Sequence, residues 1–222
     1  MKLLKKEWPQ LVLLAVPFCA AALLWNKLPE RMPVHWDVHW QVNGYAGKTM
    51  ATLLLPCLNI GLALLLGLVP LMDPMLKQYD PETRASLWRT MRAMRLAVSL
   101  FLCVIALGIL AVGLKAPVNM ATLMQVGLGV LFILIGNLLT KLRPNHFFGV
   151  RTPWTLKSRE VWMRTHRLAG HIMVAGGLGL AVLSLVVPPA YYFYCVFIPV
   201  FAVMAIVPVA YSYLIYPAQN RV

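Results

Sequence analysis

The sequence predicts an all-α integral membrane protein with six transmembrane helices. Of its 222 residues, 60% are hydrophobic and only 12% are charged, and the mean hydropathy is +0.73. Soluble domains are closer to half apolar and one quarter charged. A helix that crosses the hydrocarbon core of a bilayer needs about 20 mostly apolar residues. Six such runs follow one another, at residues 8–25, 51–72, 96–114, 120–140, 168–187 and 191–216.

The six runs are continuously apolar and do not alternate with a period of two residues, which favours helices over barrel strands. They leave no room for a separate soluble domain, so we expect one polytopic membrane domain. Within it we distinguish an N-terminal two-helix unit at residues 8–72 and a four-helix unit at 96–216. The first run follows three lysines, as a signal peptide would, but it is longer than a signal core of 7–15 residues. We therefore expect it to be retained as a span.

The positive charge is concentrated on one side of the predicted topology. Sixteen of the twenty Lys and Arg residues lie in four segments on that side, at 1–7, 73–95, 141–167 and 221. The other four are Lys27, Arg31, Lys48 and Lys115. The positive-inside rule therefore predicts that both termini are cytoplasmic. We expect this basic side to face anionic lipid headgroups of the bilayer, and not nucleic acid, because no nucleic-acid-binding motif is present.

Several shorter elements are predicted between and within the spans. In the segment 73–95, the residues after Pro81 fit a basic amphipathic helix that lies on the headgroups. The short connections at 115–119 and 188–190 predict antiparallel helix pairs. Two pairs of small residues in the fifth run predict close helix packing, within the chain or across a homodimer. These pairs are Ala175 with Gly179, and Gly177 with Ala181.

The loop at 26–50, on the side with few charges, contains a candidate metal site. Asn43-Gly44 is a strong turn signal, and the preceding residues alternate between apolar and polar, which predicts a short strand. Because alternate strand residues share a face, His35, Asp37 and His39 could bind a divalent metal such as zinc. The alternative is a hydrogen-bonded loop in which Asp37 orients a histidine. A zinc site would also need a fourth ligand.

The loop at 141–167 is the richest in residues that bind other molecules. Ser158 is expected to cap a helix in which Trp162 and His166 share a face and Glu160 pairs with Arg164. One interpretation is a loop that binds lipid headgroups through Arg and Trp. Another is a recognition surface for an acidic or aromatic partner, since Arg and Trp dominate protein interfaces. No nucleophile stands at a recognisable spacing, so we predict no catalytic residue.

The segment 136–170 resembles the signature of the SdpI family of bacterial membrane proteins. The family pattern contains Asn, then Gly-x-Arg-Thr-Pro-Trp-Thr, then Trp and Thr-His-Arg near the next span. It matches Asn145, Gly149, Arg151, Thr152, Pro153, Trp154, Thr155, Trp162, Thr165, His166 and Arg167. The outer loop resembles the N-terminal domain of the same proteins, at Leu28, Pro29, Pro33, His35, Trp36, Asp37, Asn43, Gly44 and Tyr45. Two departures occur: Trp40 stands where the family usually has Gly, and His39 is outside the family pattern.

The resemblance implies an immunity protein of the bacterial cytoplasmic (inner) membrane. Proteins of this family protect the producing cell from a secreted, membrane-active peptide toxin. A member of the family also sequesters a cytoplasmic transcription repressor. The implied cytoplasmic binding residues are Asn145, Gly149, Arg151, Trp154, Trp162, His166 and Arg167. The implied extracytoplasmic ones are His35, Trp36, Asp37, Asn43, Gly44 and Tyr45.

Two other functions are kept as alternatives. One is a membrane-embedded, metal-dependent enzyme that uses His35 and Asp37, or Asn145, Arg151 and His166, as its polar groups. The other is a transporter of a small solute or lipid. A transporter would need a polar path, and we find few polar residues within the spans. The notable ones are Asn59, Gln125, Asn137 and His171.

Overall fold

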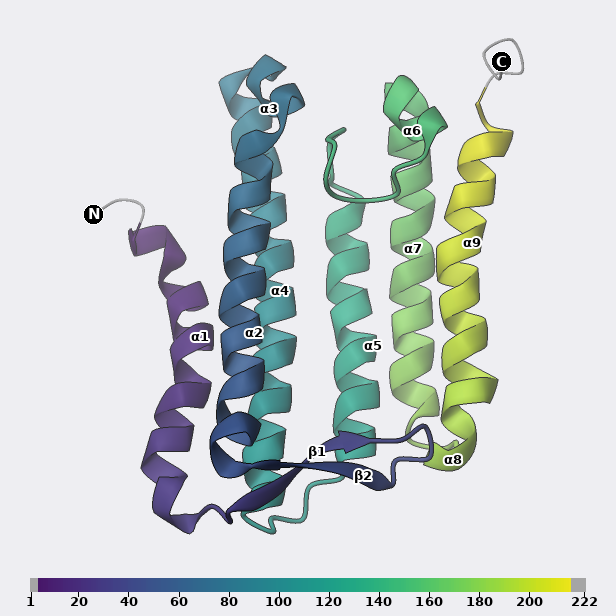
Figure 1. Ribbon diagram of the computed structural model, residues 1–222. Helices are drawn as coiled ribbons and strands as arrows, with labels where there is room; N and C mark the ends of the chain where they lie inside the picture. Colours follow the sequence, from purple (N-terminus) through teal and green to yellow (C-terminus); the bar gives the residue numbers. More distant parts are fainter. Residues whose placement is uncertain (1–3, 217–222) are drawn as a thin grey trace.

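The computed structural model describes residues 4–216 as a bundle of long helices with a β-hairpin across one end (Figure 1). Six helices are long and apolar enough to cross a membrane, which confirms the predicted spans. They correspond to α1 (Leu4–Leu24), α2 (Lys48–Leu68), α4 (Pro81–Gly113), α5 (Met120–Leu139), α7 (Arg159–Leu183) and, as the main part of the helical stretch Pro189–Leu214, α9 (Ile198–Leu214). The short α8 (Pro189–Tyr192) and a π-helical turn (Phe193–Phe197) lead into α9. Lys2 and Arg221, counted above as basic, lie outside the described residues.

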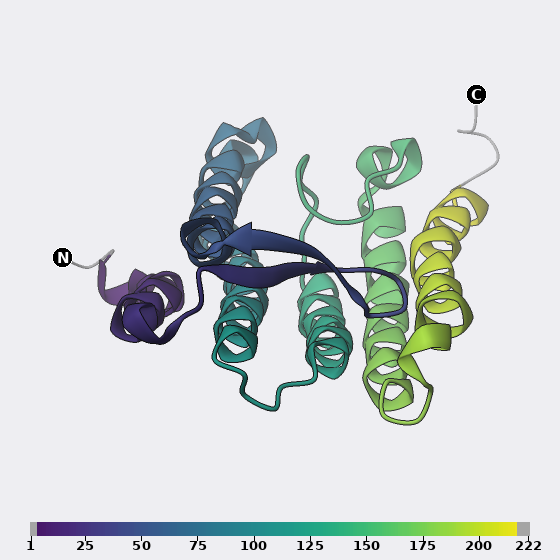
Figure 2. The same cartoon turned by 60° about the horizontal axis from the view of Figure 1, so that its bottom comes forward.

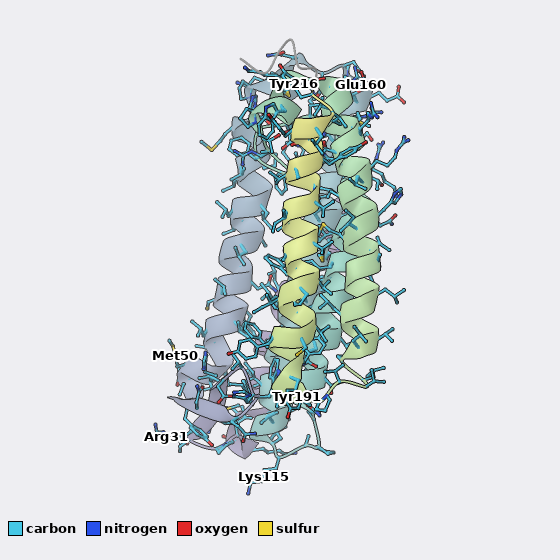
Figure 3. The ribbon with its side chains drawn as sticks, turned by 90° about the vertical axis from the view of Figure 1, so that its right-hand side faces the viewer. Arg31, Met50, Lys115, Glu160, Tyr191 and Tyr216 are labelled. Carbon is cyan, nitrogen blue, oxygen red and sulfur yellow. The ribbon has the colours of Figure 1, made fainter. Side chains whose placement is uncertain are left out.

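The two ends of the bundle carry different elements. The hairpin end holds the strands β1 (Arg31–Trp36) and β2 (Val42–Gly47), which follow the 3-10 turn Trp25–Lys27. The opposite end, here called the motif end, holds a 3-10 turn (Val69–Met72), α3 (Pro74–Gln78) and α6 (Pro153–Lys157). Figure 3 shows Arg31, Met50, Lys115 and Tyr191 at the first end and Glu160 and Tyr216 at the second. The basic segments 73–95 and 141–167 thus meet at one end, where α1 also begins and α9 ends (Figure 1).

The hairpin lies across the ends of the helices (Figure 2) and is anchored by its first strand. Met32 is fully buried in a cluster that includes Leu28, Ile109 and Met120. The strands are antiparallel, with register shifts on either side of His35. The predicted strand and its hairpin return are confirmed, but the predicted position of the turn is wrong.

The turn lies at residues 37–41, and Asn43-Gly44 belongs to β2. Asp37 organises it: its backbone N–H donates to the carbonyl of Gln41, at 2.9 Å, and its Oδ1 accepts from the backbone N–H of His39 and of Gln41, at 2.9 and 2.8 Å. Gly44 is required in the strand for another reason. A Cβ at Gly44 would lie 2.8 Å from the Cβ of His35 on the facing strand. Close approach, rather than turn geometry, accounts for this glycine.

Helix α4 is a single helix of 33 residues, which corrects the prediction of a separate helix lying on the headgroups. Asp80 caps its start by accepting hydrogen bonds from the N–H groups of Glu82 and Thr83, at 3.0 and 2.9 Å. The apolar face of its first turns packs against protein, not lipid: Leu87 and Met91 are buried in a cluster with Leu142 and Trp162. The segment is amphipathic as predicted, but its apolar side packs against α3, the loop after α5, and α7, through Leu76, Leu142 and Trp162.

Helices α5 and α7 form the most extensive helix pair of the fold, because glycines let their backbones approach. A Cβ on Gly177 would lie 2.5 Å from the carbonyl oxygen of Gly129, and a Cβ on Gly129 would lie 2.9 Å from the Cβ of Ala181. The pair Gly177 and Ala181 therefore packs within the chain, as predicted. Gly179 faces open space and Ala175 is exposed, so the second predicted pair lies outside this seam.

We expect Gly177→Ala to destabilise the bundle by about 1–3 kcal/mol, because the new methyl group forces α5 and α7 apart. Gly179→Ala, two residues along the same helix, is the matched control. It should be neutral or stabilising by up to about 1 kcal/mol, because Ala favours helices and the site is open. Thermal unfolding in detergent measures both. Equal effects of the two substitutions would contradict the close-packing account.

Candidate functional site

The loop between α5 and α6 is folded around the side chain of Asn145, which is fully buried. Its Oδ1 accepts hydrogen bonds from the backbone N–H groups of Phe147 and Phe148, at 3.0 and 2.6 Å. Its Nδ2 donates to the carbonyl groups of Arg143 and Phe148, at 3.0 and 3.2 Å. The amide therefore satisfies four backbone groups of a segment with no regular structure. A group so fully occupied holds the loop in place and has little capacity left for a ligand.

Trp162 and His166 of α7 pack against this loop and bind its backbone. Their rings stack with centroids 4.0 Å apart, and the indole N–H of Trp162 donates to the carbonyl of Leu142 at 2.9 Å. The Nε2 of His166 accepts from the backbone N–H of Val150 at 3.0 Å, so this nitrogen carries no proton. Its Nδ1 then donates to the carbonyl of Trp162 at 2.8 Å. Both ring nitrogens are thus engaged within the chain, and the ring is neutral.

Gly149 has to be glycine because the loop passes directly over His166. Its φ is +100°, a conformation that L side chains rarely adopt, and a Cβ there would collide with the Nε2 of His166. The sequence pattern marked Gly149 and His166 as separate members of one motif. The structure brings them into direct contact.

The threonines of the motif build the start of α6. The Oγ1 of Thr155 accepts from the backbone N–H of Thr152 at 2.9 Å, and the Oγ1 of Thr152 accepts from the N–H of Thr155 at 3.2 Å, a reciprocal cap. Thr152 also lies 3.1 Å from the hydroxyl of Ser212 on α9. Trp154 packs edge-on against Tyr213 with ring centroids 5.0 Å apart. This part of the motif joins α6 to α9.

Asp73 ties the motif loop to the first half of the chain. Its Oδ2 accepts from the backbone N–H of His146 and its Oδ1 lies against the Nδ1 of the same residue, both at 2.8 Å. Burial raises the pKa of the Asp73 carboxyl, but the hydrogen bonds from His146 and from the N–H of Met75 outweigh burial and hold this pKa below its usual value. Nearby, the hydroxyl of Tyr79 donates to the carbonyl of Pro144 at 2.9 Å. Two long-range anchors therefore fix residues 144–146.

The motif separates into a buried frame and an exposed basic surface. Asn145, Trp162 and His166 are at most 1% exposed. Arg151 and Arg167 are exposed, together with further basic residues of the same end. These are Lys141, Lys157, Arg159 and Arg164. Of these, Arg164 pairs with Glu160 at 3.3 Å, as predicted, between two solvent-exposed side chains. The groups of the motif that can reach a ligand are thus mainly arginines.

At the hairpin end, His35, Asn43 and Tyr45 of the second motif are exposed, and Trp36, Asp37 and Gly44 are half-buried. The Nδ1 of His35 donates to the Oδ1 of Asn43 at 2.6 Å across the two strands. Tyr45 is 57% exposed. Trp40 adopts a φ of +62°, the left-handed region that favours glycine. The Trp40 side chain is thus held on a strained backbone, and it lines the pocket beneath the hairpin.

The structure does not bring the predicted metal ligands together. Within residues 4–216, no group of three His, Cys, Asp or Glu side chains is placed to hold a metal ion. The strand that would have aligned them ends at Trp36, so Asp37 lies in the turn and one of its oxygens is occupied by backbone N–H groups. The loop is hydrogen-bonded, as the alternative expected, but Asp37 binds backbone N–H groups and orients no histidine ring; the ring of His35 pairs with Asn43 instead.

A pocket of about 290 Å³ lies between the hairpin and the helix ends. Trp36 and Trp40 line it from the hairpin, Met50 from α2, Ile105 from α4 and Met124 from α5. Its walls are almost entirely apolar, and His35 is its main polar neighbour. The pocket can therefore accept an apolar or aromatic group that arrives at this end of the bundle.

Several of these residues were not predicted from the sequence. Asp73 precedes a proline, which marks a helix start, but nothing in the sequence links it to His146. The pocket residues of α2, α4 and α5 belong to apolar runs without a distinguishing pattern. Thr165 was noted only as part of the motif; it is fully buried and its hydroxyl has no hydrogen-bond partner among the described residues.

His166→Ala should destabilise the protein by about 1–3 kcal/mol, the cost of leaving a part-buried N–H donor, that of Val150, without an acceptor. The residues after Gly149 should also become more sensitive to protease. His171→Ala is the control, because His171 is exposed on the same helix; it should change stability by less than about 0.5 kcal/mol. Thermal unfolding and limited proteolysis of the purified protein measure both. An unchanged loop in His166→Ala would refute the framing role.

Asp73 should make stability depend on pH in a defined direction. Because its folded-state pKa lies below the ordinary value of 3.8, its contribution is complete above about pH 4 and is lost as the pH falls below that value. Asp73→Asn should therefore destabilise the protein at pH 7, and the difference from the wild type should shrink towards pH 3. Unfolding curves across this range test it. A difference that stays constant with pH would show that the charge of Asp73 is irrelevant.

Comparisons with known proteins agree with both motifs. Residues 141–212 match the SdpI/YfhL protein family, and residues 12–60 match a domain of unknown function, DUF1648. The immunity protein SdpI of Bacillus subtilis (strain 168) is 25% identical over 181 residues, which cover 82% of each chain. No solved structure matches the chain. These matches confirm the resemblance predicted from the two motifs: the chain is a multi-pass membrane protein that is similar to SdpI and matches the SdpI/YfhL protein family at residues 141–212.

Proposed function

We propose that the protein is an immunity protein of the bacterial cytoplasmic membrane that protects the cell against a secreted, membrane-active peptide toxin. The observation that carries this proposal is the similarity to the Bacillus subtilis immunity protein SdpI over 82% of the chain. This similarity extends through most of the chain and so includes both ends of the bundle. The proposal places the hairpin outside the cell and the motif end in the cytoplasm, in line with the positive-inside rule.

The geometry of the hairpin end supports its role as the surface that meets the toxin. A peptide that enters a membrane from outside carries apolar side chains, and the pocket beneath the hairpin is lined by such groups and opens near exposed polar residues. Trp36 and Trp40 resemble the aromatic residues that dominate binding energy at protein interfaces. The partner we propose here is thus a peptide that inserts an apolar side chain between the hairpin and α2.

The motif end suits a second, cytoplasmic partner. The exposed side chain of Arg151 stands on the loop, and that of Arg167 stands on α7. Asn145, Trp162 and His166, all buried, hold the loop against this helix. Preorganised guanidinium groups bind carboxylates well, because few side chains have to be ordered on binding. We propose that this basic surface binds an acidic patch of a cytoplasmic protein, such as a transcription repressor. Asn145 and His166 then act as positioning residues and not as contacts.

A survival assay tests the immunity proposal. The chain is expressed in a sensitive bacterium that is challenged with a panel of membrane-active peptide toxins, with membrane levels checked by blot. The wild type should protect against at least one toxin. Trp36→Ala should lower the highest toxin concentration that the cells survive about thirtyfold or more, because truncation of an interface tryptophan costs about 2 kcal/mol or more.

Gln41→Ala is the matched control, because Gln41 lies exposed in the hairpin turn and does not line the pocket; it should protect like the wild type. Arg151→Gln should leave protection intact if the motif end serves only the cytoplasmic partner. Absence of protection by the wild type against the whole panel would overturn immunity as the direct role. Equal loss in Trp36→Ala and Gln41→Ala would remove the pocket from the proposal.

A further inference from the structure

A second pocket, of about 370 Å³, lies at the motif end between α1, α2 and α4, away from both family motifs. One face of α4 supplies three arginines to its lining, Arg89, Arg92 and Arg95. Glu7 of α1 is the acidic residue of the lining, and Gly67 of α2 forms part of the opposite wall. The pocket therefore holds three guanidinium groups against one carboxylate.

The existing contacts do not neutralise this charge. Glu7 pairs with two of the arginines: its Oε1 lies 3.3 Å from the Nε of Arg92, and its Oε2 contacts the Nη2 of Arg95. The side chains of Arg92 and Arg95 are only 27% and 15% exposed, so screening by water is limited. The Nε of Arg95 is buried without a hydrogen-bond partner among the described residues, and the ion pair that the Nε of Arg92 makes with Glu7 lacks hydrogen-bond geometry. A guanidinium has five donors, and Glu7 can satisfy only some of them.

The side chain of Arg95 occupies space that Gly67 leaves open on α2. Gly67 has no side chain, and a Cβ there would lie 2.7 Å from the Nη1 of Arg95. The guanidinium can therefore rest against the backbone of α2 instead of extending to solvent. The apolar run of α4 begins at residue 96, so this charge stands at the boundary between the hydrocarbon core and the headgroups. Trp88 and Leu66, also in the lining, supply apolar walls at the same level.

We propose that this pocket binds a phosphate-bearing anion at the membrane surface. Guanidinium groups bind phosphate oxygens through paired N–H donors, and basic pockets between transmembrane helices accept anionic headgroups. Repulsion among the three arginines destabilises the empty pocket, and a bound phosphate relieves it. Binding should therefore stabilise the folded bundle in proportion to the concentration of the anion. The phosphate comes from a lipid headgroup or from solution, and the effect of inorganic phosphate on the unfolding temperature distinguishes the two sources.

The test uses the purified full chain in dodecyl maltoside. Thermal unfolding is followed while phosphatidylglycerol, phosphatidylcholine or inorganic phosphate is added. Phosphatidylglycerol should raise the unfolding temperature and phosphatidylcholine should not. Inorganic phosphate has no effect if the headgroup is the ligand; it reproduces the stabilisation if free phosphate is the ligand.

Arg89→Gln is the informative variant, because Arg89 lines the pocket but is exposed, so its loss leaves Glu7 paired. It should weaken the apparent affinity about fivefold, the effect of one basic residue near an anionic surface. Arg84→Gln, which removes an exposed charge of the same helix outside the pocket, should stay within about twofold of the wild type. Far-UV circular dichroism checks that both variants are folded.

The proposal is overturned if phosphatidylcholine stabilises as much as phosphatidylglycerol without an effect of inorganic phosphate. It is also overturned if the Arg84 and Arg89 variants weaken binding equally, which would indicate general surface charge. Neither result depends on whether the protein confers immunity.

Discussion

The irregular chain between α5 and α7 must satisfy its own backbone, and much of the motif end depends on how it does so. Residues that leave a helix carry N–H and C=O groups without helical partners, and burying them unpaired is costly. Asn145 satisfies four of these groups, and Trp162 and His166 satisfy two more. Trp162 also packs in the cluster that holds Leu87 and Met91, so the same residue links α7 to α4. The buried residues of the motif therefore stabilise the fold of this end of the bundle.

This division changes how the motif should be interpreted. An Asn, a Trp and a His close together at one end of a membrane bundle suggest a binding site, yet the three are buried and their polar atoms are used internally. The accessible groups are arginines, one on the loop and others on α7. The hairpin end is built in the opposite way. There the buried anchor is a single apolar residue, Met32, and the aromatic and polar residues of its motif remain near the surface.

The sequence was sufficient for features set by length and local chemistry. The bilayer imposes a minimum run of apolar residues, so all six spans could be predicted, and Ser158 was correctly expected to cap α7, where it accepts from the N–H of Val161 at 3.3 Å. The sequence was not sufficient for features that depend on contacts between segments far apart in the chain. Asn43-Gly44 looks like a turn, but the strand pairing required Gly44 for its lack of a Cβ, and the turn formed around Asp37. The same displacement separates the three predicted metal ligands.

The length of α4 has a mechanical consequence. Its 33 residues extend for about 50 Å, well beyond the hydrocarbon thickness of a bilayer. One end lies beneath β1, where Gly113 receives the side chain of Met32, and the other carries Leu87 into the cluster below the motif loop. A helix is stiff over this length, so a tilt of about 5° about one end would displace the other by about 4 Å. The packed contacts at the two ends of the bundle are therefore joined mechanically by one element.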